Sequence, residues 1–128
     1  NCDNVDQQYV LYLYYYISAS NYRRYMNEFT LLGKTVGNIE IKTSESGTKY
    51  ANLLLDVRRP YKNKEGEYEH DVISLTGFKN AADFLENVSE GSMLTVKGHI
   101  SANSYTKDGR IFYSNSMIID RADYVPTY

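Results

Sequence analysis

Glycine-containing turns divide the chain from Met26 onward, and their regular spacing is the feature that most restricts its fold. Ser46-Gly47, Asn63 to Gly66 and Asp108-Gly109 are turn sequences, and each lies between segments that contain β-branched and aromatic residues. In several segments the apolar residues recur at every second position, which is the period of a strand with one buried face. The pattern therefore predicts mainly β-structure after Met26.

The segments between these turns predict five strands and one helix. Pro60 and the turn that follows it are expected to end the second strand, and a glycine bend is expected inside the first. Asn80 to Val88 has apolar residues at i, i+4 and i+7, which predicts a short amphipathic helix that ends before Gly91. The expected strands are Phe29–Gly33 continuing as Thr35–Ile41, Tyr50–Val57, Asp71–Phe78, Met93–Tyr105 and Ile111–Tyr124.

This element order indicates a fold class. Five strands with a helix between the third and the fourth are typical of the oligonucleotide/oligosaccharide-binding (OB) fold. Gly33, Gly77 and Gly98 suit the tight strand bends of such a barrel. We therefore expect an all-β, five-stranded OB-fold barrel over residues 26–124, with one short helix between strands 3 and 4. Residues 125–128 are expected to be a short C-terminal remnant.

Residues 1–25 differ in composition from the rest, because they hold half of the chain's 14 tyrosines. We expect an N-terminal leader that is disordered or derived from an expression vector, since termini are usually poorly ordered unless tied down. The alternative is that its β-prone aromatic residues add a strand to a sheet edge.

Several functional classes lack support in the sequence. With one cysteine, Cys2, the chain can form neither an intrachain disulfide nor a multi-cysteine metal site, and we expect a cytoplasmic protein. No apolar run approaches the length of a membrane span. His70 and His99 are the only histidines, and no phosphate-binding loop or nucleophile motif accompanies them, so we expect neither an enzyme nor a cofactor.

From Met26 the sequence resembles bacterial single-stranded DNA-binding proteins over about residues 26–124. The matching segments are Met26–Lys34, Ser46-Gly47-Thr48 with Ala51-Asn52-Leu53, Arg58–Asn63, Phe78–Ala82, Glu90-Gly91-Ser92 with Val96-Lys97-Gly98, and Tyr105 before Asp108-Gly109-Arg110. The resemblance implies sequence-independent binding and protection of single-stranded DNA during replication, recombination and repair. It also implies a homo-oligomer, since the relatives are most often tetramers.

A protein that binds single strands needs cations beside flat aromatic rings, which stack on unpaired bases. Three aromatic residues here have cationic neighbours, and the resemblance assigns base stacking to Tyr61, Phe78 and Tyr105. The residues expected to contact phosphates are Lys34, Arg58, Arg59, Lys62, Lys79, Lys107 and Arg110.

The sequence also departs from this family. Val72 stands where relatives often carry an aromatic residue, and Ser101, Asn103 and Ser104 stand where many carry cations. Fewer phosphate contacts predict a shallower salt dependence. The acidic C-terminal tail through which relatives recruit partners is not present in this chain, which ends at Tyr128.

The balance of 14 basic against 16 acidic residues, a net charge of −2, argues against a strongly basic nucleic-acid binder. Much of the acidity lies in a row at every second position, opposite Tyr68 and His70 on a strand, and consists of Glu65, Glu67, Glu69 and Asp71. The row is compatible with a solvated hairpin, with an edge that repels DNA, or with a Mg²⁺ site.

Fold alone does not separate three functions. The leading one is the binding of single-stranded DNA. The alternatives are a protein-interaction or primosome-assembly module, and an OB fold that binds RNA or an oligosaccharide.

Overall fold

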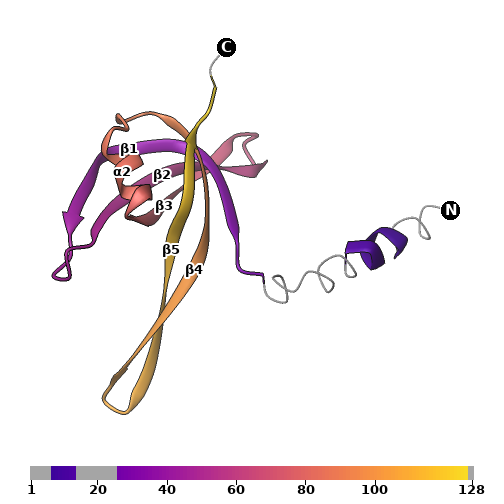
Figure 1. Cartoon of the computed structure of the whole chain (residues 1–128). Coiled ribbons are helices and arrows are strands. Elements are labelled where there is room, and N and C mark those ends of the chain that lie inside the picture. Colours follow the sequence, from indigo (N-terminus) through magenta and orange to yellow (C-terminus); the bar gives the residue numbers. More distant parts are fainter. Residues whose placement is uncertain (1–6, 14–25, 127–128) are drawn as a thin grey trace.

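The computed structural model describes residues 7–13 and 26–126 (Figure 1). Residues 7–13 are helical, and their apolar side chains are exposed. The rest of the predicted leader, residues 1–6 and 14–25, lies outside the described residues, and so do residues 127–128 of the predicted C-terminal remnant.

Residues 26–126 form a closed barrel in which the strands follow the order β1-β2-β3-β5-β4. The elements are β1 (Phe29–Thr43), β2 (Lys49–Lys62), β3 (Tyr68–Phe78), α2 (Asn80–Glu86), β4 (Met93–Lys107) and β5 (Arg110–Tyr124). The barrel closes through a short parallel pairing of β3 with β5, and every other pairing is antiparallel. The predicted five-stranded barrel, with its helix between the third and fourth strands, is confirmed.

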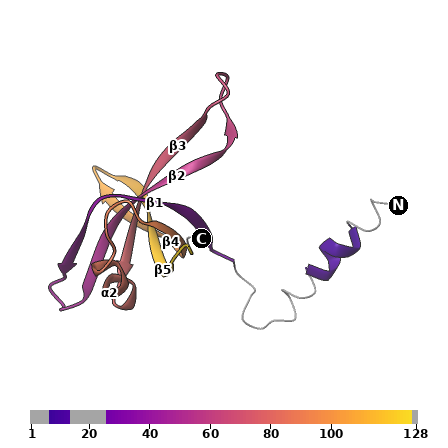
Figure 2. The same cartoon turned by 90° about the horizontal axis from the view of Figure 1, so that it is seen from above.

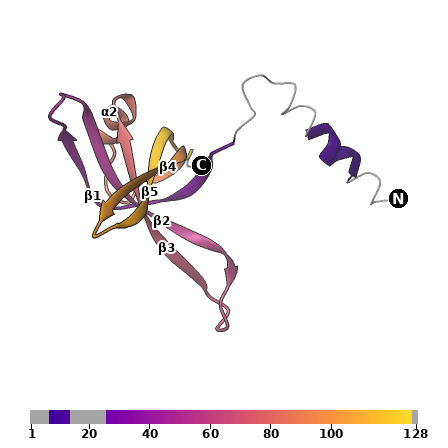
Figure 3. The same ribbon diagram turned by 90° about the horizontal axis from the view of Figure 1, so that it is seen from below.

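Two hairpins project from this barrel. The β4–β5 hairpin forms a long arm (Figure 1), and the tip of the β2–β3 hairpin points in another direction (Figures 2 and 3). Within residues 26–126, strand residues 101–116 pair only with one another, so we call this segment the arm. At its base the side-chain amide of Asn27 bonds both backbone groups of Ile100, with distances of 2.7 and 2.9 Å.

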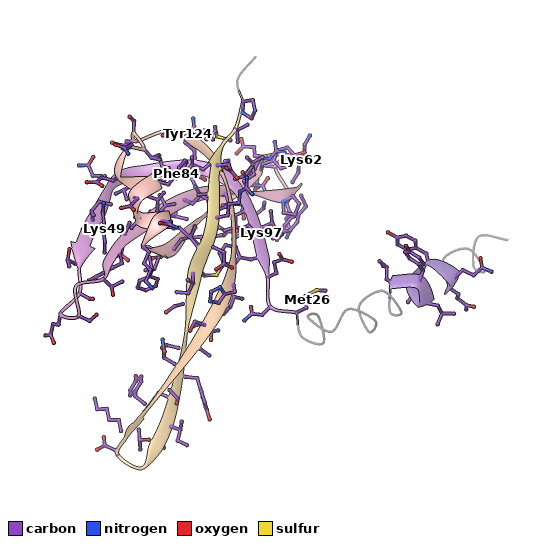
Figure 4. All side chains as sticks on the ribbon, in the orientation of Figure 1. Met26, Lys49, Lys62, Phe84, Lys97 and Tyr124 are labelled. Atoms are coloured by element: carbon purple, nitrogen blue, oxygen red, sulfur yellow. The ribbon has the colours of Figure 1, made fainter. Side chains whose placement is uncertain are left out.

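The core fills the barrel and the space under α2. Alternate residues of β2, among them Leu53 and Leu55, point inward and are fully buried, as the period of two predicts. Helix α2 adds Ala82 and Leu85. The rings of Phe84 on α2 and Tyr124 on β5 lie 5.2 Å apart and pack the helix against the barrel (Figure 4).

The predicted bend in the first strand is placed at the wrong glycine. β1 runs without a break through Gly33, where a Cβ atom would lie 2.5 Å from the backbone oxygen of Asp56. Gly33 therefore permits a close approach of β1 to β2. The irregularity lies between Val36 and Glu40, where Gly37 has a φ of +69°.

The other predicted bounds change at the ends of elements. β2 continues through Pro60 to Lys62, because the ladder is already interrupted there and needs no N–H from a proline. β3 consequently begins at Tyr68 instead of Asp71. The helix ends at Glu86, two residues before the predicted Val88.

The arm is longer than predicted. β4 and β5 reach Lys107 and Arg110, because Asp108 and Gly109 both have positive φ and form the two-residue turn that matches the twist of a hairpin.

Gly98 generates a stability prediction. A Cβ atom there would collide with the backbone oxygen of Ile118 and lie 2.7 Å from the ring of Phe29. Gly98→Ala should therefore lower the free energy of unfolding by about 3 kcal/mol, as overpacking against backbone does. Gly47→Asn is the control, because no atom lies within 4 Å of a Cβ built there, and we expect a loss of about 1 kcal/mol or less. Urea denaturation of both variants measures the difference, and equal losses would contradict the prediction.

Candidate nucleic-acid interface

The β2–β3 hairpin has one face toward the barrel core and one toward solvent. Since Leu53 and Leu55 point inward, strand alternation places the even-numbered residues of both strands on the outer face. The cross-strand pairs on this outer face are Tyr50–Phe78, Asn52–Thr76, Leu54–Ser74, Asp56–Val72, Arg58–His70 and, after an irregularity, Lys62–Tyr68. At about 3.4 Å per residue, the face extends about 27 Å from Tyr50 to Arg58.

Tyr68 is the centre of a cluster of cations near the hairpin tip. The Arg58 guanidinium lies 4.1 Å from the centre of the Tyr68 ring, and the Lys62 ammonium lies 5.6 Å from it. Both distances are within the range of cation–π attraction. Figure 4 labels Lys62 at this end of the molecule. The ring remains 39% exposed, so it combines an aromatic surface with two positive charges at the surface.

Beside this cluster is a hollow of about 360 Å³ on the outer wall of the barrel. It combines positive, apolar and acidic groups, and its lining residues are Leu32, Lys34, Asp56, Arg58, His70 and Met93. The His70 Nδ1 and Asp56 Oδ1 atoms are 2.7 Å apart. Two of the predicted phosphate-binding residues, Lys34 and Arg58, are thus brought together.

The opposite face of the hairpin tip carries an ion-pair cluster. Arg59 bonds the Asp71 carboxylate at 2.9 to 3.2 Å and Glu69 at 2.6 Å. The hydrogen bonds with Asp71 raise the pKa of Arg59, and those with Arg59 lower the pKa of Asp71. Tyr61 alternates with Lys62, and it therefore lies on the Arg59 face. The predicted residues Arg59 and Tyr61 are separated from the Tyr68 cluster.

The predicted acidic row is confirmed in part. Glu69 and Asp71 lie on β3 opposite Tyr68 and His70, whereas Glu65 and Glu67 precede β3 in the turn region. The row is shorter than predicted because the turn residues do not continue the strand. Within residues 7–13 and 26–126, no three His, Cys, Asp or Glu side chains converge as a metal site would require.

Phe78 and Lys79 lie at the other end of the outer face. Phe78 is 43% exposed, and its ring centre is 6.0 Å from that of Tyr50. Lys79 precedes α2 with a φ of +55°. The neighbouring Lys49 is paired with Asp83 and Glu86 of the helix, which raise its pKa.

The arm carries a second aromatic platform. Tyr105 and Phe112 are cross-strand partners whose rings stack with centres 5.2 Å apart and planes 16° apart. Lys107 and Arg110 form the next pair on the same face of the arm, by the alternation of the two strands. The predicted residues Tyr105, Lys107 and Arg110 therefore share one face.

Sequence reasoning missed Tyr68 and Phe112 as candidate binding residues. Phe112 could be found from hairpin register, because it lies opposite Tyr105 when Asp108-Gly109 is a two-residue turn. Tyr68 was harder to find, because its pairing with Lys62 depends on the irregularity near Pro60.

Comparison with known proteins adds independent information. The sequence model of the Single-strand binding protein family matches residues 26–125. Single-stranded DNA-binding protein 1 of Staphylococcus aureus (strain Mu50 / ATCC 700699) is 30% identical over 102 residues, which are 78% of this chain and 65% of that protein. Single-stranded DNA-binding protein 2 of Staphylococcus aureus (strain COL) is 28% identical over 102 residues, which are 78% of this chain and 73% of that protein.

Among solved structures, a deletion mutant of the single-stranded DNA binding protein from Thermus aquaticus matches with a TM-score of 0.65 and 14% identity. The match covers 79% of this chain and 51% of that one, and it supports the fold. The chain spans about 65% of the length of the Staphylococcus aureus relative with 30% identity. Within the described residues, no helix is long and apolar enough to cross a membrane.

Proposed function

Because the chain belongs to the single-strand binding protein family, we propose that it binds single-stranded DNA without sequence preference. This role is non-enzymatic: the protein covers exposed strands in the cytoplasm and protects them during replication, recombination and repair. The names of its relatives support the proposal, since they are called single-stranded DNA-binding proteins.

The observation that carries the proposal is the separation of charge between the two faces of the β2–β3 hairpin. Arg58 and Lys62 surround the Tyr68 ring on the outer face, while Glu69 and Asp71 are held by Arg59 on the other face. The outer face of strands 2 and 3 is also where OB folds bind oligonucleotides. A net charge of −2 is compatible with this binding, because the field at the surface decides contact.

We assign the rest of the DNA-binding surface to both hairpins. Phe78 with Lys79 offers a separate contact at the far end of the outer face, beyond Leu54 and Val72, and the Tyr105–Phe112 stack with Lys107 and Arg110 offers a second platform on the arm. Lys34 belongs to this surface, because it lines the same hollow as Arg58. Successive bases stack on such rings while the cations hold the phosphates. Tyr61 remains a prediction from the sequence, since it lies on the Arg59 face.

Strand preference tests the function. Fluorescence anisotropy of a labelled polythymidine of about 35 nucleotides, longer than the site of one barrel, should report tight binding that weakens with salt. Unlabelled duplex should fail to displace the strand, because duplex bases are not exposed for stacking. A chain without residues 1–25 should bind equally, since we propose residues 26–124 as the binding domain.

No binding at micromolar protein would contradict the function and favour a protein-interaction module, and a preference for RNA would favour the RNA-binding alternative.

Alanine variants test the two platforms. Tyr68→Ala and Tyr105→Ala should each weaken polythymidine binding by about 1–3 kcal/mol, because each removes a stacking surface. Tyr113→Ala is the matched control: Tyr113 is 75% exposed, and it lies on the opposite face of the same arm. Tyr61→Ala, measured in parallel, tests the assignment made from the sequence. If the Tyr113 variant loses as much affinity as the Tyr105 variant, the assigned face of the arm is wrong.

We further propose that the protein forms a homotetramer. A group of exposed apolar side chains on the outer wall supports self-association: Val36 and Leu54 are cross-strand partners, and Val72 on β3 lies diagonally from Leu54. These side chains are 37%, 45% and 58% exposed. Burying such a patch against a second copy removes apolar surface from water.

The oligomer proposal predicts a change in mass. Leu54→Ser should shift the molecular mass in light scattering from that of four chains toward one or two, because it removes the centre of the patch. Ile111→Ser removes a 59% exposed apolar side chain from the arm and serves as the control. A monomeric parent protein, or an equal shift in both variants, would contradict the proposed interface.

A further inference from the structure

Arg59 forms the densest set of charged contacts on the β2–β3 hairpin. Its Nε and Nη2 atoms donate to Asp71, with Nε 3.2 and 3.0 Å from Oδ1 and Oδ2 and Nη2 2.9 Å from Oδ1. Its Nη1 atom donates to Glu69 Oε2 at 2.6 Å. We call this cluster of Arg59, Glu69 and Asp71 the Arg59 lock. Planar guanidinium groups suit such multiple contacts with carboxylates.

The lock spans the place where the ladder between β2 and β3 is interrupted. Arg58 pairs with His70 and Lys62 pairs with Tyr68, so residues 59–61 of β2 lie opposite residue 69 alone. Such an interruption leaves the strands without regular hydrogen bonds, and Pro60 has no N–H to offer. The side chain of Arg59 therefore supplies cross-strand contacts where backbone contacts are missing.

The interruption determines what lies on the outer face. In an uninterrupted register Lys62 would lie opposite Gly66 in the turn, whereas the observed shift places it opposite Tyr68. Both Arg58 and Lys62 then reach the same ring, from opposite sides of the irregular stretch. The contact of two cations with Tyr68 depends on this register.

We propose that Arg59 is a positioning residue that holds the interrupted hairpin in the register placing Arg58 and Lys62 over Tyr68, without contacting the bound strand. This inference rests on the proposed function, and it replaces the phosphate contact expected for Arg59 from the sequence. One guanidinium faces two carboxylates, so the lock carries a net negative charge that disfavours a phosphate. The strand passes over the opposite face.

The competing explanation is that Arg59 contacts a phosphate and that the two carboxylates restrain it in the free protein. The two explanations predict opposite effects when the carboxylates are neutralised. Glu69→Gln with Asp71→Asn removes the lock, which weakens binding if the lock positions the hairpin. The same change strengthens binding and steepens the salt dependence if it releases Arg59 toward DNA.

The experiment compares the full chain with Arg59→Ala, with the Glu69→Gln/Asp71→Asn double variant, and with a Glu65→Gln/Glu67→Gln double variant. The last is the charge-matched control, because it removes the same charge from the turn region of the same hairpin. Polythymidine affinity is measured by anisotropy over a salt series. Hydrogen exchange of the hairpin amides, measured without DNA, shows whether the Arg59 lock stabilises the hairpin, independently of any binding.

We expect Arg59→Ala to weaken binding about three- to tenfold, the range that a network of exposed charges supplies, with an unchanged salt slope. The Glu69/Asp71 variant should bind more weakly than its charge-matched control. In both variants the hairpin amides should exchange faster than in the parent protein.

Any one of three results would overturn the inference. The first is a salt slope reduced by about 0.7 in Arg59→Ala, as the loss of one phosphate contact predicts. The second is tighter binding by the Glu69/Asp71 variant than by its control, and the third is an unchanged rate of hairpin amide exchange in Arg59→Ala. Failure of the parent protein to bind polythymidine would instead contradict the proposed function, and exchange would still decide whether the lock holds the register.

Discussion

The short parallel pairing between β3 and β5 closes the barrel, and the rest of the structure depends on it. Only Thr76–Ile118 and Gly77–Ile119 form this contact, and Gly77 lies under helix α2, where a Cβ would be 3.0 Å from that of Ala81. Because the barrel is closed, each of its strands is hydrogen-bonded to a neighbouring strand on both sides. Strands β2–β3 and β4–β5 continue to pair beyond the closed part as hairpins, and these hairpins carry the candidate interface.

The interface results from strand alternation applied to those hairpins. A projecting hairpin exposes both faces to water, so each face can carry a different kind of side chain. The β2–β3 tip has an aromatic ring with two cations on one face and the Arg59 lock on the other. Total charge therefore says little about such a protein, because at the hairpin tip cations predominate on the outer face and carboxylates on the other face.

Sequence reasoning predicted the barrel, its element order and most of the arm platform, because turn glycines and the period of two are local signals. It misplaced the bend of β1 and ended β2 at Pro60, because both depend on how a neighbouring strand pairs. For the same reason it grouped Tyr61 with Arg59 and Lys62 by proximity in sequence, whereas alternation places Lys62 with Tyr68. A register shift is a property of two strands, and one strand's sequence does not reveal it.

The arm differs from the barrel in the number of neighbouring strands that stabilise it. Within residues 26–126, the strands beyond Ile100 pair only with each other, and the Asn27 amide bonds Ile100 at the base of the arm. A two-stranded hairpin alone is marginally stable in water. We therefore expect the arm to open in local fluctuations that leave the barrel intact. A strand that binds the Tyr105–Phe112 stack would suppress these fluctuations, so part of the binding energy would be spent on ordering the protein.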